Sequence, residues 1–372
     1  MRIGIDARPL TKKFKSGICV YLENIIRCLS NSLRDKEDCV FYLYAHRPFY
    51  LPNLGENFKL VLDNVNLPGT IWVQTKLPYL INKDKIDIFW GTQQVLPIFN
   101  VNKRVKMLLT VNDLIYKRFP ETMEVINYWI NILLTPVSIK KSDQIIAISK
   151  NTANDLGYYY PKNKKPVKVI YAGVTNEFVC LEAAAAKRYV HKKFKIELPY
   201  ILVLGTQEPR KNFITAFKAF IQVSKRFPHL LVSVGYPGWK IKAILEEIKR
   251  SSLAERVIFL DYVKKDDLPF LYSAAEVFLF PSLYEGFGIP PLEAMACGCP
   301  VISSNAASLP EVIGKAGILL PPEEICLWDD SISRVLSNKS LSRKLKQDGM
   351  EQAKKFSWEK STAELWDLFF RL

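Results

Sequence analysis

The sequence predicts an α/β protein built from two doubly wound parallel sheets. Many of its short strand-like runs are apolar throughout, which is typical of parallel strands buried on both faces. These runs alternate with segments of helical periodicity, and the strand–helix–strand order occurs twice along the chain. A length of 372 residues also suits two domains better than one.

Thirteen segments are expected to be strands. The first sheet is predicted from residues 2–7, 39–45, 58–63, 86–91, 105–111, 144–149 and 167–173. The second is predicted from residues 200–206, 230–235, 256–261, 277–282, 300–304 and 317–321. The polar, basic stretch 174–199 has no strand pattern, so the domain boundary is expected there.

Helical periodicity is clearest in residues 17–33 and 212–227. The last residues, 356–372, are amphipathic as well. They either form a terminal helix of the second domain or cross back to dock on the first.

Composition narrows the classes of partner. The net charge is +15, with an excess of +10 in residues 1–180 and +5 in residues 181–372. This indicates either a solvated basic surface or an anionic partner, such as a diphosphate or a lipid headgroup. The densest basic run, 187–195, lacks the glycine and aromatic pattern of an RNA-recognition sheet, so nucleic acid is not expected.

Cysteines and hydropathy indicate a cytoplasmic protein. The seven cysteines are scattered and odd in number, which argues against a disulfide framework. No apolar run reaches the roughly 18 residues of a spanning helix. The N-terminal sequence lacks the features of a signal peptide.

The stretch 282–305 holds two glutamates, Glu285 and Glu293, separated by a tight turn. It follows a predicted strand, and ligands of doubly wound sheets bind beyond the carboxyl ends of the strands. Gly286 and Gly288 allow the backbone to turn sharply and approach a ligand. A helix is expected to begin at the two prolines that follow, with Glu293 in its first turn.

This stretch combines features that suit a nucleotide sugar. Backbone N–H groups and the dipole at a helix N-terminus attract phosphate, while carboxylates can hold sugar hydroxyls. Arg210 and Lys211 lie at the corresponding end of another predicted strand. Cations there can stabilise a departing diphosphate, although two surface charges on a turn would look the same in the sequence.

Several segments, in order along the chain, resemble the retaining glycosyltransferases of sequence family 4. Glu285 and Glu293 match the two glutamates of the E-x7-E motif of that family. The stretch that contains Arg210 and Lys211 resembles its phosphate-binding segment. Further resemblances lie in residues 4–10, 16–25, 110–121, 147–156 and 308–322.

The resemblance implies the GT-B fold, in which two Rossmann-like domains face a cleft. The expected domains are residues 1–178 with a returning helix 357–372 on the acceptor side, and residues 179–356 for the nucleotide sugar. By resemblance, Glu285 lies beside the transferred sugar and Glu293 binds the ribose hydroxyls. The resemblance also implies that Arg210 and Lys211 neutralise the diphosphate.

Other donor contacts are implied by the same resemblance. The backbone amides of Gly286, Phe287 and Gly288 would face sugar and phosphate. Gly17 would bring the first helix N-terminus towards the leaving phosphates. In the segment 110–114, Asn112 and Asp113 occupy the donor-binding position.

Two departures from the family pattern bear on activity. Asn112 stands where a histidine that contacts the donor sugar is common, and asparagine cannot carry a proton. Cys19 and Val20 stand where a second glycine and an arginine are common.

The predicted reaction is retaining transfer of a hexose from a nucleotide-diphosphate sugar, with GDP-mannose favoured over UDP-sugars. The acceptor would be a glycan or a lipid-linked glycan of cell-surface polysaccharide synthesis. No metal or other cofactor is expected, because the chain has no D-x-D motif and cations can replace a metal. A non-catalytic nucleotide-sugar binder, or another GT-B enzyme such as an epimerase, is the alternative.

A peripheral location at the inner face of an anionic membrane is also predicted. The candidate contacts are Lys12, Lys13, Phe14 and Lys15, which follow the first strand.

Overall fold

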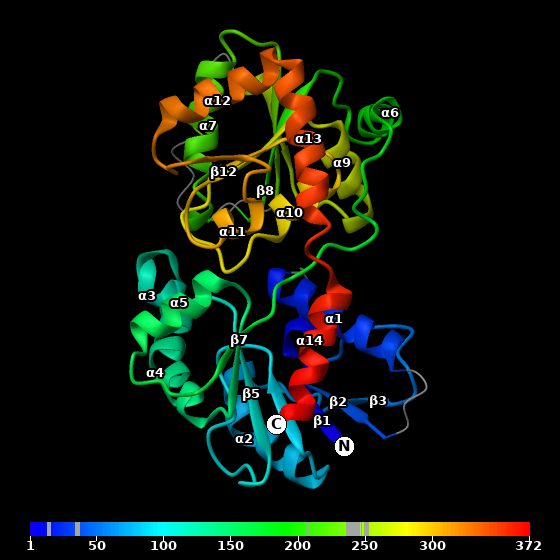
Figure 1. Cartoon of the computed structure of the whole chain (residues 1–372), viewed down its shortest axis with the longest axis vertical. Helices are drawn as coiled ribbons and strands as arrows, with labels where there is room; N and C mark the ends of the chain where they lie inside the picture. The colour runs from blue at the N-terminus through cyan, green and yellow to red at the C-terminus, as the bar shows by residue number, and fades with distance from the viewer. Residues whose placement is uncertain (13–15, 34–37, 207, 236–245, 247, 249–252) are drawn as a thin grey trace. The chain divides into compact units, whose positions relative to one another are not determined.

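The computed structural model describes residues 1–12, 16–33, 38–206, 208–235, 246, 248 and 253–372. The chain forms two compact units, Met1–Gly173 with Ser357–Leu372, and Val174–Phe356 (Figure 1). The predicted division was 1–178 with 357–372, and 179–356.

The first unit is built on a parallel sheet in the order β3-β2-β1-β4-β5-β6-β7. Its strands are β1 (Arg2–Asp6), β2 (Val40–Ala45), β3 (Phe58–Leu62), β4 (Ile88–Gly91), β5 (Lys106–Val111), β6 (Gln144–Ala147) and β7 (Val167–Val169). Its α-helices are α1 (Gly17–Ser32), α2 (Gly69–Lys83), α3 (Ile115–Arg118), α4 (Val125–Lys141), α5 (Lys150–Tyr159) and α14 (Trp358–Arg371). Short 3₁₀ turns follow β1 and α3, at η1 (Arg8–Thr11) and η2 (Pro120–Thr122).

The second unit has a parallel sheet in the order β10-β9-β8-β11-β12-β13. Its strands are β8 (Tyr200–Leu204), β9 (Leu230–Val234), β10 (Val257–Leu260), β11 (Val277–Phe280), β12 (Val301–Ser304) and β13 (Ile318–Leu320). Its described α-helices are α6 (Ala183–Phe194), α7 (Phe213–Val223), α9 (Leu268–Ala274), α10 (Ile289–Ala296), α11 (Leu309–Ile313), α12 (Ile325–Ser337) and α13 (Lys339–Ala353). Its 3₁₀ turns are η3 (Pro209–Lys211), η4 (Ala254–Arg256) and η5 (Lys265–Asp267).

The predicted fold class is confirmed, since each of the thirteen expected strands coincides with a strand of the structure. Both sheets bury apolar side chains against helices, as the uninterrupted apolar runs require. The core of the first unit includes Tyr44, Trp72, Phe89, Leu109 and Ile145. That of the second includes Val203, Phe217, Leu279, Ile302 and Trp328.

One predicted helix ends earlier than expected. The periodicity of 212–227 becomes α7, which stops at Val223. The residues that follow form turns, in which the backbone N–H groups of Lys225 and Arg226 donate to the carbonyls of Gln222 and Val223. Pro228 then disfavours helical backbone at the residue before it, so the helix cannot extend.

The C-terminal helix α14 belongs to the first unit and packs beside α1 (Figure 1). The Trp358 ring meets Tyr21 of α1 edge-on at 5.6 Å. Towards the other end, Phe369 meets Trp90 of β4 at 6.2 Å. The helix therefore completes the core of a unit whose last strand, β7, lies almost two hundred residues earlier in the sequence.

Among the described residues, no helix combines the length and the hydropathy that crossing a membrane would need.

Gly173 gives a test of how α14 is seated. A Cβ at this position would lie 2.4 Å from the Trp358 backbone nitrogen and 2.6 Å from the Ser357 carbonyl carbon. Because backbone atoms cannot rotate away, Gly173→Ala should destabilise the first unit by about 1–3 kcal/mol. Denaturant unfolding followed by circular dichroism measures the change.

The matched control is Gly157→Ala in α5, where a Cβ would meet open space. This change should leave stability equal or raise it by up to about 1 kcal/mol, since alanine favours helix. Equal stability of the Gly173→Ala protein and the wild type would contradict the close packing of Gly173 on α14.

Candidate active site

The candidate site lies where the strand order of the second sheet reverses, between β8 and β11. Loops that leave the carboxyl ends of such neighbouring strands form the usual ligand site of a doubly wound sheet. The loop after β8 carries Arg210 and Lys211 in η3. The loop after β11 carries Glu285 and leads into α10.

The structure brings Arg210, Lys211 and Glu285 together in one ion-pair cluster. Lys211 Nζ lies 2.6 Å from Glu285 Oε1, and Arg210 Nη1 lies 2.9 Å from Glu285 Oε2. The second amino group of Arg210 also contacts Glu208 Oε1, at 2.5 Å. The two carboxylate oxygens of Glu285 thus face two different cations.

Burial sets the electrostatics of this cluster. Burial raises the pKa of a carboxyl, but at Glu285 the charges of Arg210 and Lys211 outweigh it and lower the pKa to about 2. The pKa of Lys211 is lowered, first by its own burial and then by Arg210, while Glu285 opposes the shift. The Lys211 ammonium also lies 4.9 Å from the centre of the Phe280 ring.

Backbone contacts hold the two loops in register. Leu283 N–H donates to the Arg210 carbonyl at 2.8 Å, and Arg210 Nη1 donates to the Tyr284 carbonyl at 2.9 Å. The Ser308 hydroxyl, at the start of α11, lies within hydrogen-bond distance of the carbonyls of Glu285 and Phe287, at 2.9 and 2.6 Å. The charged side chains therefore project from a turn that is fixed before any ligand arrives.

Gly288 has the backbone conformation that the sequence indicated. Its φ is +114°, and a Cβ there would lie 2.8 Å from Leu309 Cδ2, so other residues would be strained and crowded. Gly286 lies two residues before it, half-buried. The Phe287 ring is buried against Phe356 at 5.7 Å, so this residue could offer a ligand its backbone rather than its side chain.

Glu293 is not in the first turn of the helix, and that prediction is wrong. The helix α10 begins at Ile289, which makes Glu293 its fifth residue. Pro290 and Pro291 occupy the first turn and have no N–H group, so this helix end offers fewer donors to an anion than predicted.

The pKa of Glu293 is shifted in the opposite direction to that of Glu285, although both side chains are buried. The Tyr272 hydroxyl donates to Glu293 Oε2 at 3.2 Å. Burial raises the pKa of Glu293 to about 8, and the hydrogen bond from Tyr272 opposes this only in part. At neutral pH Glu293 therefore holds a proton and can both donate and accept hydrogen bonds.

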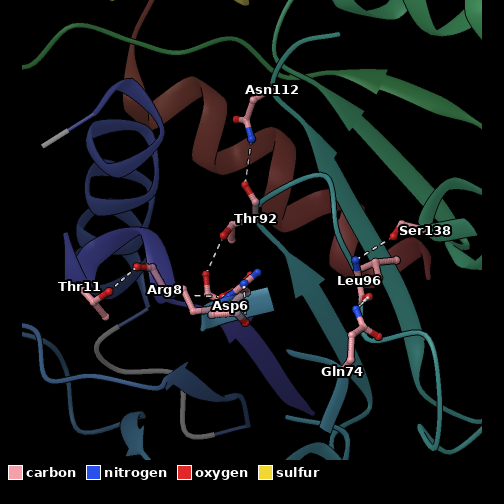
Figure 2. A network of polar contacts seen from close by, with 9 residues as sticks. Asp6, Arg8, Thr11, Gln74, Thr92, Leu96, Asn112 and Ser138 are labelled. Carbon is pink, nitrogen blue, oxygen red and sulfur yellow. Dashed lines mark hydrogen bonds and ion pairs between the residues drawn. The ribbon is translucent and has the colours of Figure 1, made fainter. Parts of the chain in front are cut away.

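The remaining predicted residues, Asn112, Asp113 and Gly17, lie in the first unit. Figure 2 shows Asn112 with the polar contacts that surround it. Asn112, directly after β5, is buried and donates through Nδ2 to the Thr92 carbonyl at 3.1 Å. The Thr92 hydroxyl in turn donates to the Asp6 carbonyl at 2.7 Å. This chain of contacts links the carboxyl ends of β5, β4 and β1.

Asp6 and Arg8, at the carboxyl end of β1, form an internal ion pair in which both side chains are buried. Arg8 Nε and Nη2 lie 2.8 and 2.6 Å from the two carboxylate oxygens of Asp6. Arg8 also donates to the Gly69 carbonyl at 3.0 Å.

Asp113 and Gly17 begin helical segments of the first unit. Asp113 Oδ1 accepts from the Ile115 N–H at 3.2 Å, at the start of α3. Gly17 is the exposed first residue of α1, where the Ser16 hydroxyl accepts from Cys19 N–H at 3.5 Å. Each unit therefore carries its own part of the predicted residue set.

Sequence reasoning missed four residues that complete these networks: Glu208, Tyr272, Ser308 and Thr92. Glu208 could have been suspected, because it precedes Arg210 by two residues. The other three come from distant segments and had no signal of their own.

A metal site is not evident among the described residues, since no three His, Cys, Asp or Glu side chains are grouped to hold an ion.

Two family models match consecutive parts of the chain. The Glycosyltransferase Family 4 model matches residues 22–178, and the model of glycosyl transferases group 1 matches residues 179–352. The two parallel-sheet units place the protein in the GT-B class. The chain belongs to the group 1 glycosyltransferases.

Curated relatives include two from Escherichia coli. The chain is 40% identical over 167 residues to O-antigen chain mannosyltransferase B, a match that covers 44% of each chain. It is 34% identical over 233 residues to the serotype-specific mannosyltransferase WbdA, covering 61% of this chain and 28% of that protein. The chain thus spans less than half the length of these two relatives.

Solved structures share the fold at low identity. Sucrose-phosphate synthase from Thermosynechococcus elongatus has a TM-score of 0.76 at 18% identity, covering 100% of this chain and 98% of that one. Anabaena HepE in complex with UDP-glucose also has a TM-score of 0.76, at 17% identity, with both chains covered completely.

The raised pKa of Glu293 predicts a pH dependence of stability. The folded-state pKa of about 8 lies above the ordinary 4.5, so between these values the folded protein binds more protons than the unfolded one. The contribution is fully present below about pH 4.5 and is lost as the pH rises to about 8. The slope is at most about 1.4 kcal/mol per pH unit.

Glu293→Gln keeps a neutral side chain and should remove this slope. Thermal unfolding of both proteins at several values between pH 5 and pH 8 measures it, with the exposed Glu323→Gln as the control. Parallel curves for the wild type and Glu293→Gln would show that the carboxyl is ionised in the fold.

Proposed function

We propose that the protein is a retaining glycosyltransferase that moves a hexose from a nucleotide-diphosphate sugar to a glycan or lipid-linked acceptor in cell-surface polysaccharide synthesis. The observation that carries the proposal is the part-buried Arg210–Lys211–Glu285 cluster at the reversal of strand order. The two mannosyltransferase relatives support mannose as the transferred hexose, and we infer GDP-mannose as its donor. HepE, whose structure holds UDP-glucose, supports a nucleotide sugar without favouring the guanine base.

Lys211 and Arg210 would stabilise the leaving diphosphate. Negative charge grows on the diphosphate as the glycosidic bond lengthens, and fixed cations in a buried site act on it more strongly than cations in water. Lys211 has three N–H donors, and Glu285 Oε1 takes one of them. In this proposal the cations do the work of a metal ion, so transfer needs no cofactor.

The two glutamates would have different roles. Glu285, with its pKa lowered to about 2, is an anion at neutral pH and can stabilise positive charge on the sugar ring. We infer attack on the same face as departure, with the leaving phosphate taking the proton of the acceptor hydroxyl. Glu293, neutral, suits the paired hydroxyls of a ribose, which both donate and accept hydrogen bonds.

A non-catalytic binder of nucleotide sugars is the second candidate, and one observation favours it. Asn112 replaces the histidine of the family pattern, and its amide already donates to the Thr92 carbonyl within the core. It therefore offers no proton transfer at this position. Transfer of the sugar, or its slow hydrolysis, separates the two candidates.

The activity test measures release of nucleoside diphosphate from GDP-mannose and from UDP-glucose, with and without EDTA. Wild-type protein should release the nucleoside diphosphate from one of these two donors, and EDTA should not change the rate. The anomeric configuration of the transferred sugar should be retained in the product. Glu285→Gln and Lys211→Met should each lower kcat by about 10²–10³-fold, the effect of losing one electrostatic contact to a transition state.

Lys218→Met is the matched control, since Lys218 is an exposed lysine on α7 of the same unit. It should keep wild-type activity. Binding of a nucleotide sugar without any turnover would favour the binder, and equal activity of the wild type and Lys211→Met would refute the proposed site.

A further inference from the structure

The outer face of α4 is an apolar stripe. Val125, Ile126, Trp129, Leu133 and Val137 are all exposed, with 75% of Ile126 and 54% of Trp129 accessible. Four of these positions are spaced by four residues and Ile126 adjoins the first, so all five lie along one side of the helix. We call these five residues the α4 stripe. Apolar faces of this kind on a folded unit usually mark a binding surface.

The side of α4 opposite the α4 stripe is packed into the first unit, so the helix that carries the stripe is held in place. Ile139, Ser138 and Thr135 are buried. The Ser138 hydroxyl accepts from the Leu96 backbone N–H at 3.0 Å, and Lys141 Nζ donates to the Ile98 carbonyl at 2.6 Å. In Figure 1 α4 lies beside α3, with α5 close by, on one side of the first unit.

The charge around the stripe is positive. The helix contains no Asp or Glu, and the exposed Lys140 lies three residues beyond Val137, on the side of the α4 stripe. Residues 115–168 contain nine Lys and Arg against four Asp and Glu. Of the four, Asp155 is paired with Arg118, and Asp143 accepts a backbone N–H from Met107.

The two remaining acids, Glu121 and Glu124, precede the helix, so the basic side of the surface is its C-terminal end. An apolar strip with a tryptophan in its length and a lysine at its end fits the boundary between headgroups and acyl chains. The exposed parts of five side chains on one helix fall short of the about 800 Å² per partner that a stable dimer buries.

We propose that the α4 stripe, with Lys140, docks the protein on an anionic membrane surface. The proposal does not depend on the transferase activity. It also assigns the contact to a different segment from the one that the sequence suggested. Lys13, Phe14 and Lys15 lie outside the described residues, and Lys12 is an exposed residue after η1.

The test is cosedimentation of the full chain with vesicles of phosphatidylcholine alone or mixed with phosphatidylglycerol. Wild-type protein should sediment with the mixed vesicles at low salt, and less so at high salt, because surface charges are screened. The double variant Trp129→Ser, Leu133→Ser should reduce partitioning by about tenfold or more, since it removes the buried apolar contact. Lys140→Glu should weaken binding to the mixed vesicles.

Tyr79→Ser is the control, because Tyr79 is an exposed aromatic residue on α2 of the same unit, 64% accessible. It should bind as the wild type does. All variants should keep wild-type melting temperatures, since the changed side chains lie on the surface.

Two results would overturn the proposal. One is equal sedimentation of the wild type and the double variant, or no sedimentation of either. The other is a wild-type dimer in sedimentation velocity that the double variant abolishes, without vesicle binding by the wild type, which would make α4 a contact between copies of the chain.

Discussion

The part-buried contact between Lys211 and Glu285 is the interaction on which the second unit's site depends. It joins the loop after β8 to the loop after β11, at 2.6 Å between Nζ and Oε1. Removing two charges from water is costly, and the attraction repays that cost only with close geometry and further partners. Here Arg210 supplies the second cation, and Glu208 compensates Arg210 on its other side. The four charges sum to zero, so the site is a neutral but strongly polar cluster that an anionic ligand can reorganise.

The same sequence motif places its two carboxyls in opposite states. Glu285 faces two cations and stays ionised, whereas Glu293 lies against the Tyr272 hydroxyl and keeps its proton. Spacing in the sequence does not determine this difference, because the partners come from other parts of the fold. The chemistry proposed for the site needs both states. An anion belongs beside a sugar ring that gains positive charge, and a neutral carboxyl suits hydroxyl groups that both donate and accept.

The strands were predictable because parallel strands buried on both faces read as uninterrupted apolar runs. Arg210, Lys211 and Glu285 could be grouped because each follows such a strand, and adjacent strands end at one edge. Tyr272, Ser308 and Thr92 could not be found, since each acts through tertiary contacts with no local pattern. The α4 stripe was missed for a related reason: a helix that is apolar on most sides looks like a core helix until its burial is known. The sequence analysis put Glu293 in the first turn of its helix, one turn too early, because helix ends are poorly defined by sequence.

The most direct test of the account is a crystal structure of the protein with a bound nucleoside diphosphate. The account predicts diphosphate oxygens within hydrogen-bond distance, about 3 Å, of Lys211 Nζ and the Arg210 guanidinium. It also predicts ribose hydroxyls at the Glu293 carboxyl. A diphosphate bound elsewhere, with the Lys211–Glu285 and Arg210–Glu285 contacts unchanged, would contradict it and make the cluster a purely structural link between two loops.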